Sequence, residues 1–194
     1  MLLRVTQYGE PILRQTGEPV TEFDDGLKAL AENMVETMFV EEGVGLAAQQ
    51  IDKALMFCVI DVSHLPEEEL DYQLDGLKPP VDLIMPMALA NPVVTVLPGR
   101  TVTAEEGCLS FPDIRGDVPR GDAIEVTYQD LNGTPHRLIC SGWFARVIQH
   151  EVDHLNGRLF IDHMDKRKLR LLDSKLKRLK RETRKARRNQ APQP

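Results

Sequence analysis

Residues 141–157 read SGWFARVIQHEVDHLNG, and this stretch predicts the helix on which the rest of the fold and its candidate chemistry depend. Ser141 is a residue type that caps helix N-termini, and apolar residues recur at helical spacing after it. Gly157 can adopt the left-handed conformation that ends many helices. We therefore expect one amphipathic helix from about residue 142 to residue 156.

Two histidines and a glutamate lie on that helix in the pattern H-E-x-x-H. His150 and His154 are four residues apart, so both imidazoles share one face and can reach one metal ion. Glu151 can then approach a water molecule on that ion and exchange a proton with it. The competing interpretation is a pair of surface histidines on a charged helix, because a five-residue pattern also recurs by chance.

A catalytic metal site of this kind needs a third protein ligand and one open position. Asp162, His163 and Asp165 follow the helix, and a downstream ligand is the arrangement of zinc metallopeptidases. Upstream, residues 105–110 read EEGCLS and place Cys108 in a tight, glycine-containing segment after an expected strand. A thiolate there is the alternative ligand, whereas a buried free cysteine is the non-functional interpretation.

A glycine-rich segment, GVGLAAQQ at residues 43–50, follows another expected helix. Small residues allow a backbone to approach a ligand closely. The segment lacks the G-x-x-x-x-G-K pattern of a phosphate-binding loop, so it does not favour a nucleotide. Taken alone, such a segment more often marks a helix C-terminus and tight packing.

The remaining pattern favours an α+β fold, with antiparallel strands packed around the central helix. Apolar residues three and four positions apart predict another amphipathic helix over residues 23–41. The other expected elements are strands at 54–60 and 93–97 and a hairpin of 124–128 and 136–140 joined by Asn132-Gly133.

Residues 63–91 interrupt these patterns. Three consecutive glutamates, Gly76 and several prolines predict a long irregular connection there. We assign no chemistry to it.

Composition excludes several classes of protein. The chain is 42% hydrophobic and 28% charged, which allows a sizeable core and argues against global disorder. No apolar run is long enough for a transmembrane helix, and the first residues do not resemble a secretory signal. Three cysteines without framework spacing argue against a disulfide-stapled secreted domain.

The charge is divided unevenly along the chain. Residues 166–188 hold 13 of the 24 Lys and Arg residues and only two acids, whereas the preceding residues hold most of the 30 Asp and Glu residues. Leucines at helical spacing predict a helix here, with one docked face and one basic face. A polyanionic partner and a merely solvated helix are both compatible with this pattern.

Three ordered segments together resemble the peptide deformylase family. Its motifs are G-x-G-L-A-A-x-Q, E-G-C-L-S and Q-H-E-x-D-H-L-x-G, and they match residues 43–50, 106–110 and 149–157 with every fixed letter present. The lead-in SGWFAR is similar to a variant of some bacteria and organelles. The resemblance covers about residues 1–165.

The resemblance implies one metal ion bound by Cys108, His150 and His154, with water as the fourth ligand. Fe²⁺ is the usual ion in this family, and Zn²⁺, Ni²⁺ or Co²⁺ can replace it. It also implies that Gln50 and the backbone N–H of Leu109 bind the oxyanion.

The implied reaction removes the N-formyl group from the N-terminal formyl-methionine of newly synthesised polypeptides and releases formate. Glu151 would move the proton from water to the leaving amine. Val44 and Trp143 are expected to line a methionine pocket, and the peptide is expected to pair with backbone near Val44 and Gly45 as an added strand.

These expectations divide the chain into a catalytic domain at 1–165 and a basic C-terminal helix with a frayed end at 166–194. The family resemblance implies that such a helix docks on ribosomal RNA in a salt-dependent manner. Bacterial cytoplasm is the expected compartment, with an organelle as the alternative, and no membrane partner is expected. The rival functions are an H-E-x-x-H metallopeptidase and a non-enzymatic ribosome-associated factor.

Overall fold

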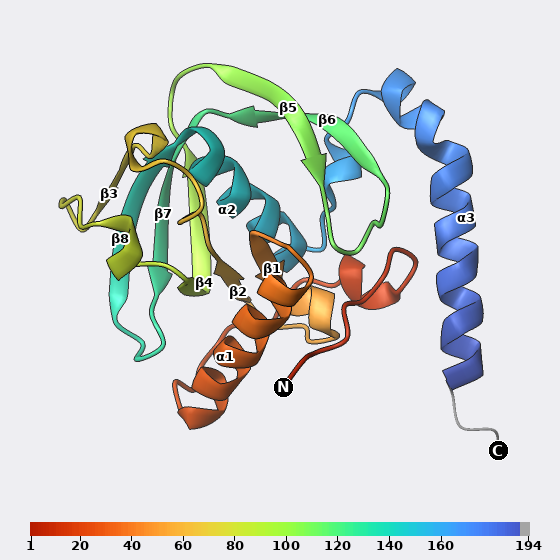
Figure 1. Ribbon diagram of the computed structural model, residues 1–194, viewed down its shortest axis with the longest axis horizontal. Helices are drawn as coiled ribbons and strands as arrows, with labels where there is room; N and C mark the ends of the chain where they lie inside the picture. The colour runs from red at the N-terminus through yellow and green to blue at the C-terminus, as the bar shows by residue number, and fades with distance from the viewer. Residues whose placement is uncertain (191–194) are drawn as a thin grey trace.

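Helix α2 (Gly142–Leu155) lies near the middle of the molecule and contacts strands of both sheets (Figure 1). The computed structural model of the protein describes residues 1–190. The other helices are α1 (Asp25–Val40) and α3 (Lys166–Gln190). The strands are β1 (Gly45–Ala47), β2 (Phe57–Ile60), β3 (Tyr72–Leu74), β4 (Met87–Val96), β5 (Thr101–Gly107), β6 (Arg115–Gly121), β7 (Ala123–Gln129) and β8 (Pro135–Ser141).

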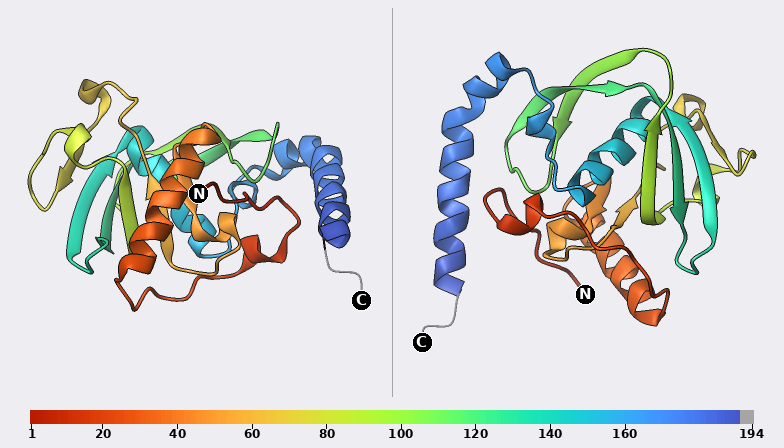
Figure 2. Two further views of the ribbon diagram at one scale, coloured as in Figure 1. Left: turned by 60° about the horizontal axis from the view of Figure 1, so that its bottom comes forward. Right: turned by 180° about the vertical axis from the view of Figure 1, so that it is seen from behind.

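The strands form two antiparallel sheets, which confirms the expected mixture of helices and antiparallel strands. The larger sheet has the order β1-β2-β4-β7-β8-β3, and β5 pairs with β6 in a separate ribbon. Strand β1 therefore ends the larger sheet at one edge, and β3 ends it at the other. Figure 2 shows the same arrangement from two further directions.

Strand β2 explains how helices cover both faces of the larger sheet. Side chains alternate between the two faces of a strand. Cys58 and Ile60 pack in the core cluster that includes α2 residues, whereas Phe57 and Val59 pack in the cluster that includes α1 residues. Because both faces are covered, this strand is apolar at every position.

Helix α2 matches the predicted bounds. Gly157 follows it with φ +67°, which confirms the expected left-handed end. Ser141 occupies the N-cap position, but its hydroxyl donates to Asp71 and does not cap the helix. The capping interaction predicted for Ser141 was therefore wrong.

The hairpin of β7 and β8 is confirmed, with Gly133 at φ +78° in its turn. The strand expected at 93–97 was predicted too short, because β4 begins at Met87. A register shift between Ala90 and Val93 interrupts its pairing with β7, and Asn91 has φ +52° there. The bulge lets one strand continue through an Asn-Pro pair that normally marks a loop.

The prediction of a wholly irregular connection at 63–91 was wrong. The segment contains β3, which pairs with β8, and its Tyr72 side chain is fully buried against Phe144 of α2. A strand of three residues is too short to show an alternating hydrophobic pattern in the sequence. The segment therefore extends the larger sheet by one edge strand.

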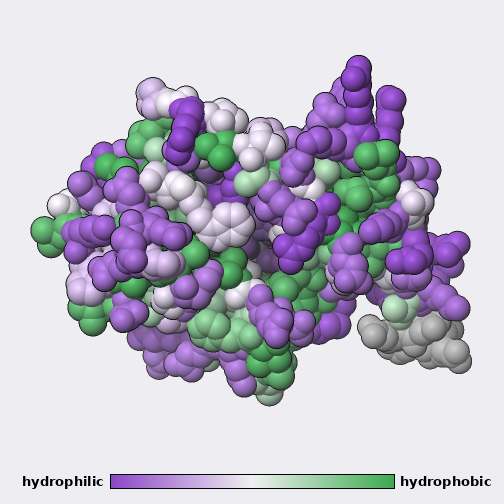
Figure 3. Space-filling model, turned by 45° about the horizontal axis from the view of Figure 1, so that its top comes forward, coloured by the Kyte–Doolittle hydropathy of each residue, from purple (hydrophilic) through white to green (hydrophobic). Residues whose placement is uncertain are grey.

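Helix α3 confirms the expected basic C-terminal helix and its docked apolar stripe. Leu176 is buried in a cluster with Leu13, Phe111 and Ile114. The segment projecting beside the body in Figure 3 is mostly hydrophilic on its outer side, with hydrophobic groups toward the body. The expected fraying of residues 191–194 lies outside the described residues. Among residues 1–190, no helix is both long and apolar enough to cross a bilayer.

Candidate active site

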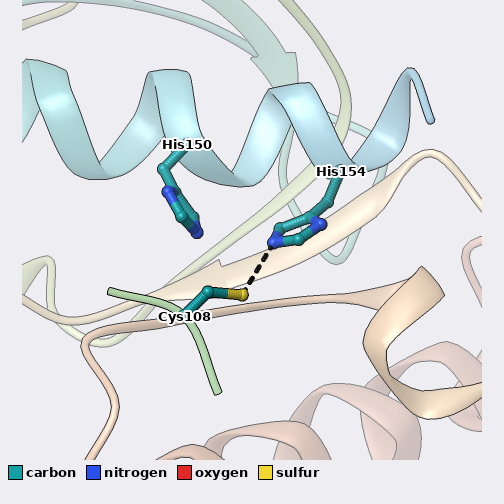
Figure 4. Close-up of side chains that lie close together, drawn as sticks. All are labelled: Cys108, His150 and His154. Atoms are coloured by element: carbon teal, nitrogen blue, oxygen red, sulfur yellow. Dashed lines mark hydrogen bonds between the residues drawn. The ribbon is translucent and has the colours of Figure 1, made fainter. Parts of the chain in front are cut away.

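Cys108, His150 and His154 converge, as predicted (Figure 4). Each offers one ligand atom, and the three atoms lie within 4.8 Å of one another. Sγ of Cys108 is 3.3 Å from Nε2 of His154. The histidines come from successive turns of α2, and the cysteine directly follows β5. Two elements distant in sequence therefore supply one sulfur and two imidazole nitrogens.

Burial disfavours protonation of one of these imidazoles. His154 is only 1% exposed, and this burial, together with the neighbouring His150, holds its pKa well below the ordinary value. A neutral imidazole retains the lone pair that a metal ion requires. The donor set of a thiol and two imidazoles fits a borderline divalent ion, such as Fe²⁺ or Zn²⁺.

Glu106 fixes the orientation of His150, and the sequence did not reveal this role. Its Oε2 accepts a hydrogen bond from Nδ1 of His150 at 2.9 Å, which leaves Nε2 of the ring for the cluster. Its Oε1 accepts from Arg120 and Arg146, both at 2.7 Å. Burial alone would raise the pKa of Glu106, but the bonds from Arg120 and His150 hold it far below its usual range. A carboxylate behind a ligand histidine is a common device for setting its tautomer and orientation.

The same network includes two buried arginines. Arg146 is buried and donates to Glu106 and to the carbonyl of Val118, so it belongs to a structural ion pair. Arg120 also donates to Asp153 at 2.6 Å. The motif carboxylate Asp153 therefore bonds an arginine of β6 and neither histidine of the cluster.

Glu151 is a buried carboxyl group, and one of its oxygens makes no hydrogen bond. It is 4% exposed, and its Oε2 has no hydrogen-bond partner among the described residues. A Cβ atom at Gly45 would lie 2.3 Å from its Oε1, so the carboxylate occupies space that only glycine leaves free. Burial raises the pKa of Glu151 to about 7. Such a group can both accept and return a proton near neutral pH.

Gln50 lies between the sulfur and the glycine-rich strand. Its Oε1 accepts from the backbone N–H of Ala47 at 2.8 Å, which fixes the amide. Its Nε2 then points toward Sγ of Cys108 and Oγ of Ser110, each at 3.4 Å. Gln50 also lines the cavity, so its amide is placed near a ligand that enters there.

A cavity of about 500 Å³ opens beside these groups. Trp143, which is 41% exposed, stands at its mouth. Figure 3 shows a hollow near the middle of the face that it draws. The predicted residues that line the cavity are Val44, Gly45, Gln50, Cys108, Leu109, Trp143, His150 and Glu151.

The downstream residues considered as a third ligand are engaged elsewhere. Nε2 of His163 lies 2.8 Å from Asp153. Asp162 pairs with Arg14, and Asp165 accepts from backbone N–H groups at the start of α3. None of the three belongs to the described metal-ligand cluster.

Comparisons with known proteins agree with this geometry. The family model described as polypeptide deformylase matches residues 2–170. The peptide deformylase of Opitutus terrae is 53% identical over 189 residues, covering 96% of this chain and 97% of the relative. That of Methylacidiphilum infernorum is 42% identical, covering 93% and 94%.

Solved structures are similar as well. The peptide deformylase from Thermotoga maritima has a TM-score of 0.72 at 39% identity, covering 85% of this chain and 99% of its own. The one from Synechococcus elongatus, in complex with actinonin, has a TM-score of 0.75 at 36% identity, covering 89% and 85%. Sequence, fold and the placement of the three motifs agree, and this chain belongs to the polypeptide deformylase family.

Proposed function

We propose that this protein removes the formyl group from the N-terminal formyl-methionine of new polypeptides, with release of formate. The observation that carries the proposal is the meeting of Cys108, His150 and His154 beside a buried, unpartnered Glu151 at a substrate-sized cavity. No contact in the described residues favours a metallopeptidase arrangement over this one.

Cys108, His150 and His154 would hold one divalent ion on the central helix α2, and Fe²⁺ is the proposed ion, with Zn²⁺, Ni²⁺ and Co²⁺ as substitutes. Three protein ligands leave one coordination position open, as catalytic sites require. When bound, the ion lowers the pKa of its water and polarises the formyl carbonyl. Glu106 serves this arrangement by holding the ring of His150.

Glu151 would receive the proton of the attacking water and deliver it to the leaving amine. Its buried carboxyl has a pKa raised to about 7, which suits both directions of transfer. The oxyanion that develops on the formyl group requires preorganised donors. Nε2 of Gln50 and the backbone N–H of Leu109 are the proposed donors, since both residues line the cavity.

The methionine side chain would lie between Val44, Trp143 and Val147 of the cavity wall. Strand β1 ends the larger sheet, so one of its edges has no partner strand among the described residues. An extended peptide can add to such an edge through backbone hydrogen bonds. We place the substrate backbone beside Val44 and Gly45 for this reason.

We further propose that residues 1–165 form the catalytic unit and that α3 binds a polyanion, ribosomal RNA in particular. The support is the row of bases on its outer face. Its exposed members include Lys177, Arg181, Arg184, Lys185 and Arg188. Because the protein would act on nascent chains, we propose the bacterial cytoplasm as its compartment. Binding that weakens steeply with salt is expected.

One assay tests the main proposal. Protein prepared without oxygen and loaded with Fe²⁺ is given a formyl-Met peptide and the same peptide with an acetyl group. Formate should appear from the formyl peptide, and the acetyl peptide should remain intact. Glu151→Gln should retain the ion and lose nearly all turnover. Equal cleavage of both peptides, or full activity of Glu151→Gln, would contradict the proposal.

A further inference from the structure

An early stretch of the chain contacts both segments that carry the proposed oxyanion donors. Residues 3–9 run from the side of α1 to the side of α3 (Figure 1). Along this path residues 6–8 reach the 3₁₀ helix Ala48–Ile51, which carries Gln50, and the loop after β5, which carries Leu109. Residues 6–8 lie outside the three family motifs. We call them the N-terminal brace.

Thr6 holds the backbone on the Gln50 side. Its backbone N–H donates to the carbonyl of Gln50 at 2.7 Å, and its hydroxyl donates to the carbonyl of Gln49 at 3.0 Å. Thr6 is fully buried, so water does not replace a bond that is lost there. Two bonds from one buried residue to consecutive carbonyls therefore fix the backbone from which the Gln50 amide projects.

Gln7 and Tyr8 hold the loop on the Leu109 side. Nε2 of Gln7 donates to the carbonyl of Leu109 at 3.3 Å, and the backbone N–H of Tyr8 donates to the carbonyl of Ser110 at 2.9 Å. The Tyr8 ring also stacks on Phe111, with 4.7 Å between the ring centroids. Three consecutive residues of the loop are thus each contacted by the N-terminal brace.

The peptide unit between Cys108 and Leu109 carries the proposed donor N–H. Its carbonyl oxygen accepts from the N–H of Phe111 at 2.8 Å. A trans peptide is planar, and its C=O and N–H point in opposite directions, so this bond also sets the direction of the Leu109 N–H. Because Tyr8 stacks on Phe111, and Gln7 bonds the other carbonyl of the same loop, movement of the N-terminal brace would turn this N–H.

The N-terminal brace is itself firmly held. The backbone N–H of Gln7 donates to Glu10 at 2.8 Å, and the buried Glu10 pairs with Arg4 at the same distance. Gly9 packs directly against α3, since a Cβ there would lie 3.1 Å from Cα of Lys180. A segment anchored in this way can transmit a fixed position to the two segments that it joins.

We propose that Thr6, Gln7 and Tyr8 are positioning residues that set the separation and direction of the two oxyanion donors. The inference rests on the deformylase activity proposed above. Among residues 1–190, the lining of the cavity includes none of the three, so they act through Gln50 and Leu109 and do not touch the substrate. Oxyanion donors act mainly when charge develops in the transition state. Loosening the N-terminal brace should therefore lower kcat and leave KM nearly unchanged.

The first test exchanges the Gln7 amide. Gln7→Met keeps a side chain of similar length without a donor, and kcat for formate release should fall about tenfold, which is less than the loss of a whole donor. KM should stay within about twofold of wild type. Gln7→Lys restores a donor on an unbranched side chain, so its kcat should return to within about threefold of wild type. Gln15→Met makes the same exchange at an exposed glutamine and should leave kcat unchanged.

A second pair of variants tests the stacking contact. Tyr8→Leu removes the ring that packs on Phe111 and should lower kcat by about three- to tenfold, whereas Tyr8→Phe keeps the ring and should match wild type. Amide hydrogen exchange over residues 106–112, measured by mass spectrometry without substrate, gives a readout that does not depend on turnover. Exchange there should be at least about fivefold faster in Gln7→Met and Tyr8→Leu than in wild type, and unchanged in Gln15→Met.

Metal content and thermal midpoint, measured on the same preparations, separate positioning from general damage. Wild-type kcat in both Gln7→Met and Tyr8→Leu would overturn this inference while deformylation stands. A lower kcat without faster exchange over residues 106–112, or one that merely follows a loss of metal or of folded protein, would overturn it as well. No formate from the wild-type enzyme would overturn the proposed function and this inference with it.

Discussion

Replacing Gly45 with alanine should displace the carboxylate of Glu151 and so lower the rate, although residue 151 itself is unchanged. The added Cβ would lie 2.3 Å from Oε1 and 2.7 Å from Cδ of Glu151, whereas ordinary contact begins at 3.4 Å. The strand has little freedom to move away, because Gly45 is paired with Ile60 of the neighbouring strand. The carboxylate must therefore retreat by about 1 Å, and a misplacement of that size can lower a rate about 100-fold. This corresponds to about 2.7 kcal/mol of activation free energy.

The assay is steady-state formate release at saturating formyl peptide, with metal content and thermal midpoint measured on the same preparations. Gly99→Ala is the matched control, because a Cβ there meets nothing within 4 Å. A second measurement separates a steric effect on Glu151 from general damage. In a Glu151→Ala background all three clashing atoms are absent, so Gly45→Ala should change the residual rate and the thermal midpoint much less than in wild type. A kcat within threefold of wild type for Gly45→Ala would refute this reasoning.

Three other predictions follow. Glu106→Gln leaves Arg146 buried without its carboxylate partner and Arg120 paired with Asp153 alone, so the free energy of unfolding should fall by about 3–5 kcal/mol; metal affinity should fall about 10–100-fold, measured by competition with a chromophoric chelator. Removal of the ion by a chelator should abolish formate release and lower the thermal midpoint, and re-addition of Fe²⁺ or Co²⁺ should restore both, since the ion binds the folded site; an unchanged midpoint would argue against a bound ion. Arg181→Ala/Arg184→Ala/Arg188→Ala should weaken RNA binding in filter assays and reduce its salt dependence while leaving peptide kcat/KM within twofold, and unaltered RNA affinity would dismiss the polyanion role.

The part of the site that lies on α2 was predictable from local pattern alone. His150 and His154 share a helical face because of their four-residue spacing, and the structure places both at the cluster. Cys108 was not predictable in this way. It reaches the histidines because the β5–β6 ribbon lies over α2, and that approach is a property of tertiary packing. The sequence alone left it between a ligand and a buried thiol, and only the family resemblance favoured the ligand.

The buried ion pairs around Glu106 show a second limit of prediction from the sequence. The sequence contains Glu105, Glu106, Arg115 and Arg120 on adjacent strands, and any pairing among them is compatible with the pattern. The structure buries Glu106 with Arg120 and leaves Glu105 exposed near Arg115. Side chains alternate across a strand, so strand register decides which acid faces the core, and register depends on the pairing of β5 with β6. Local patterns carry no information on that choice.

The position of α3 shows why its basic face and its apolar face must be tested separately. Leu176 packs with Phe111 and Ile114, and the same cluster is flanked by Cys108. Phe111 and Ile114 also line the cavity, so the helix supports the wall that carries a proposed metal ligand. Deleting residues 166–194 would both remove the bases and expose this wall. A loss of activity could then come from the missing bases or from a disturbed cavity. Substitutions on the exposed basic face leave Leu176 in place, and they therefore separate binding of a polyanion from support of the catalytic cavity.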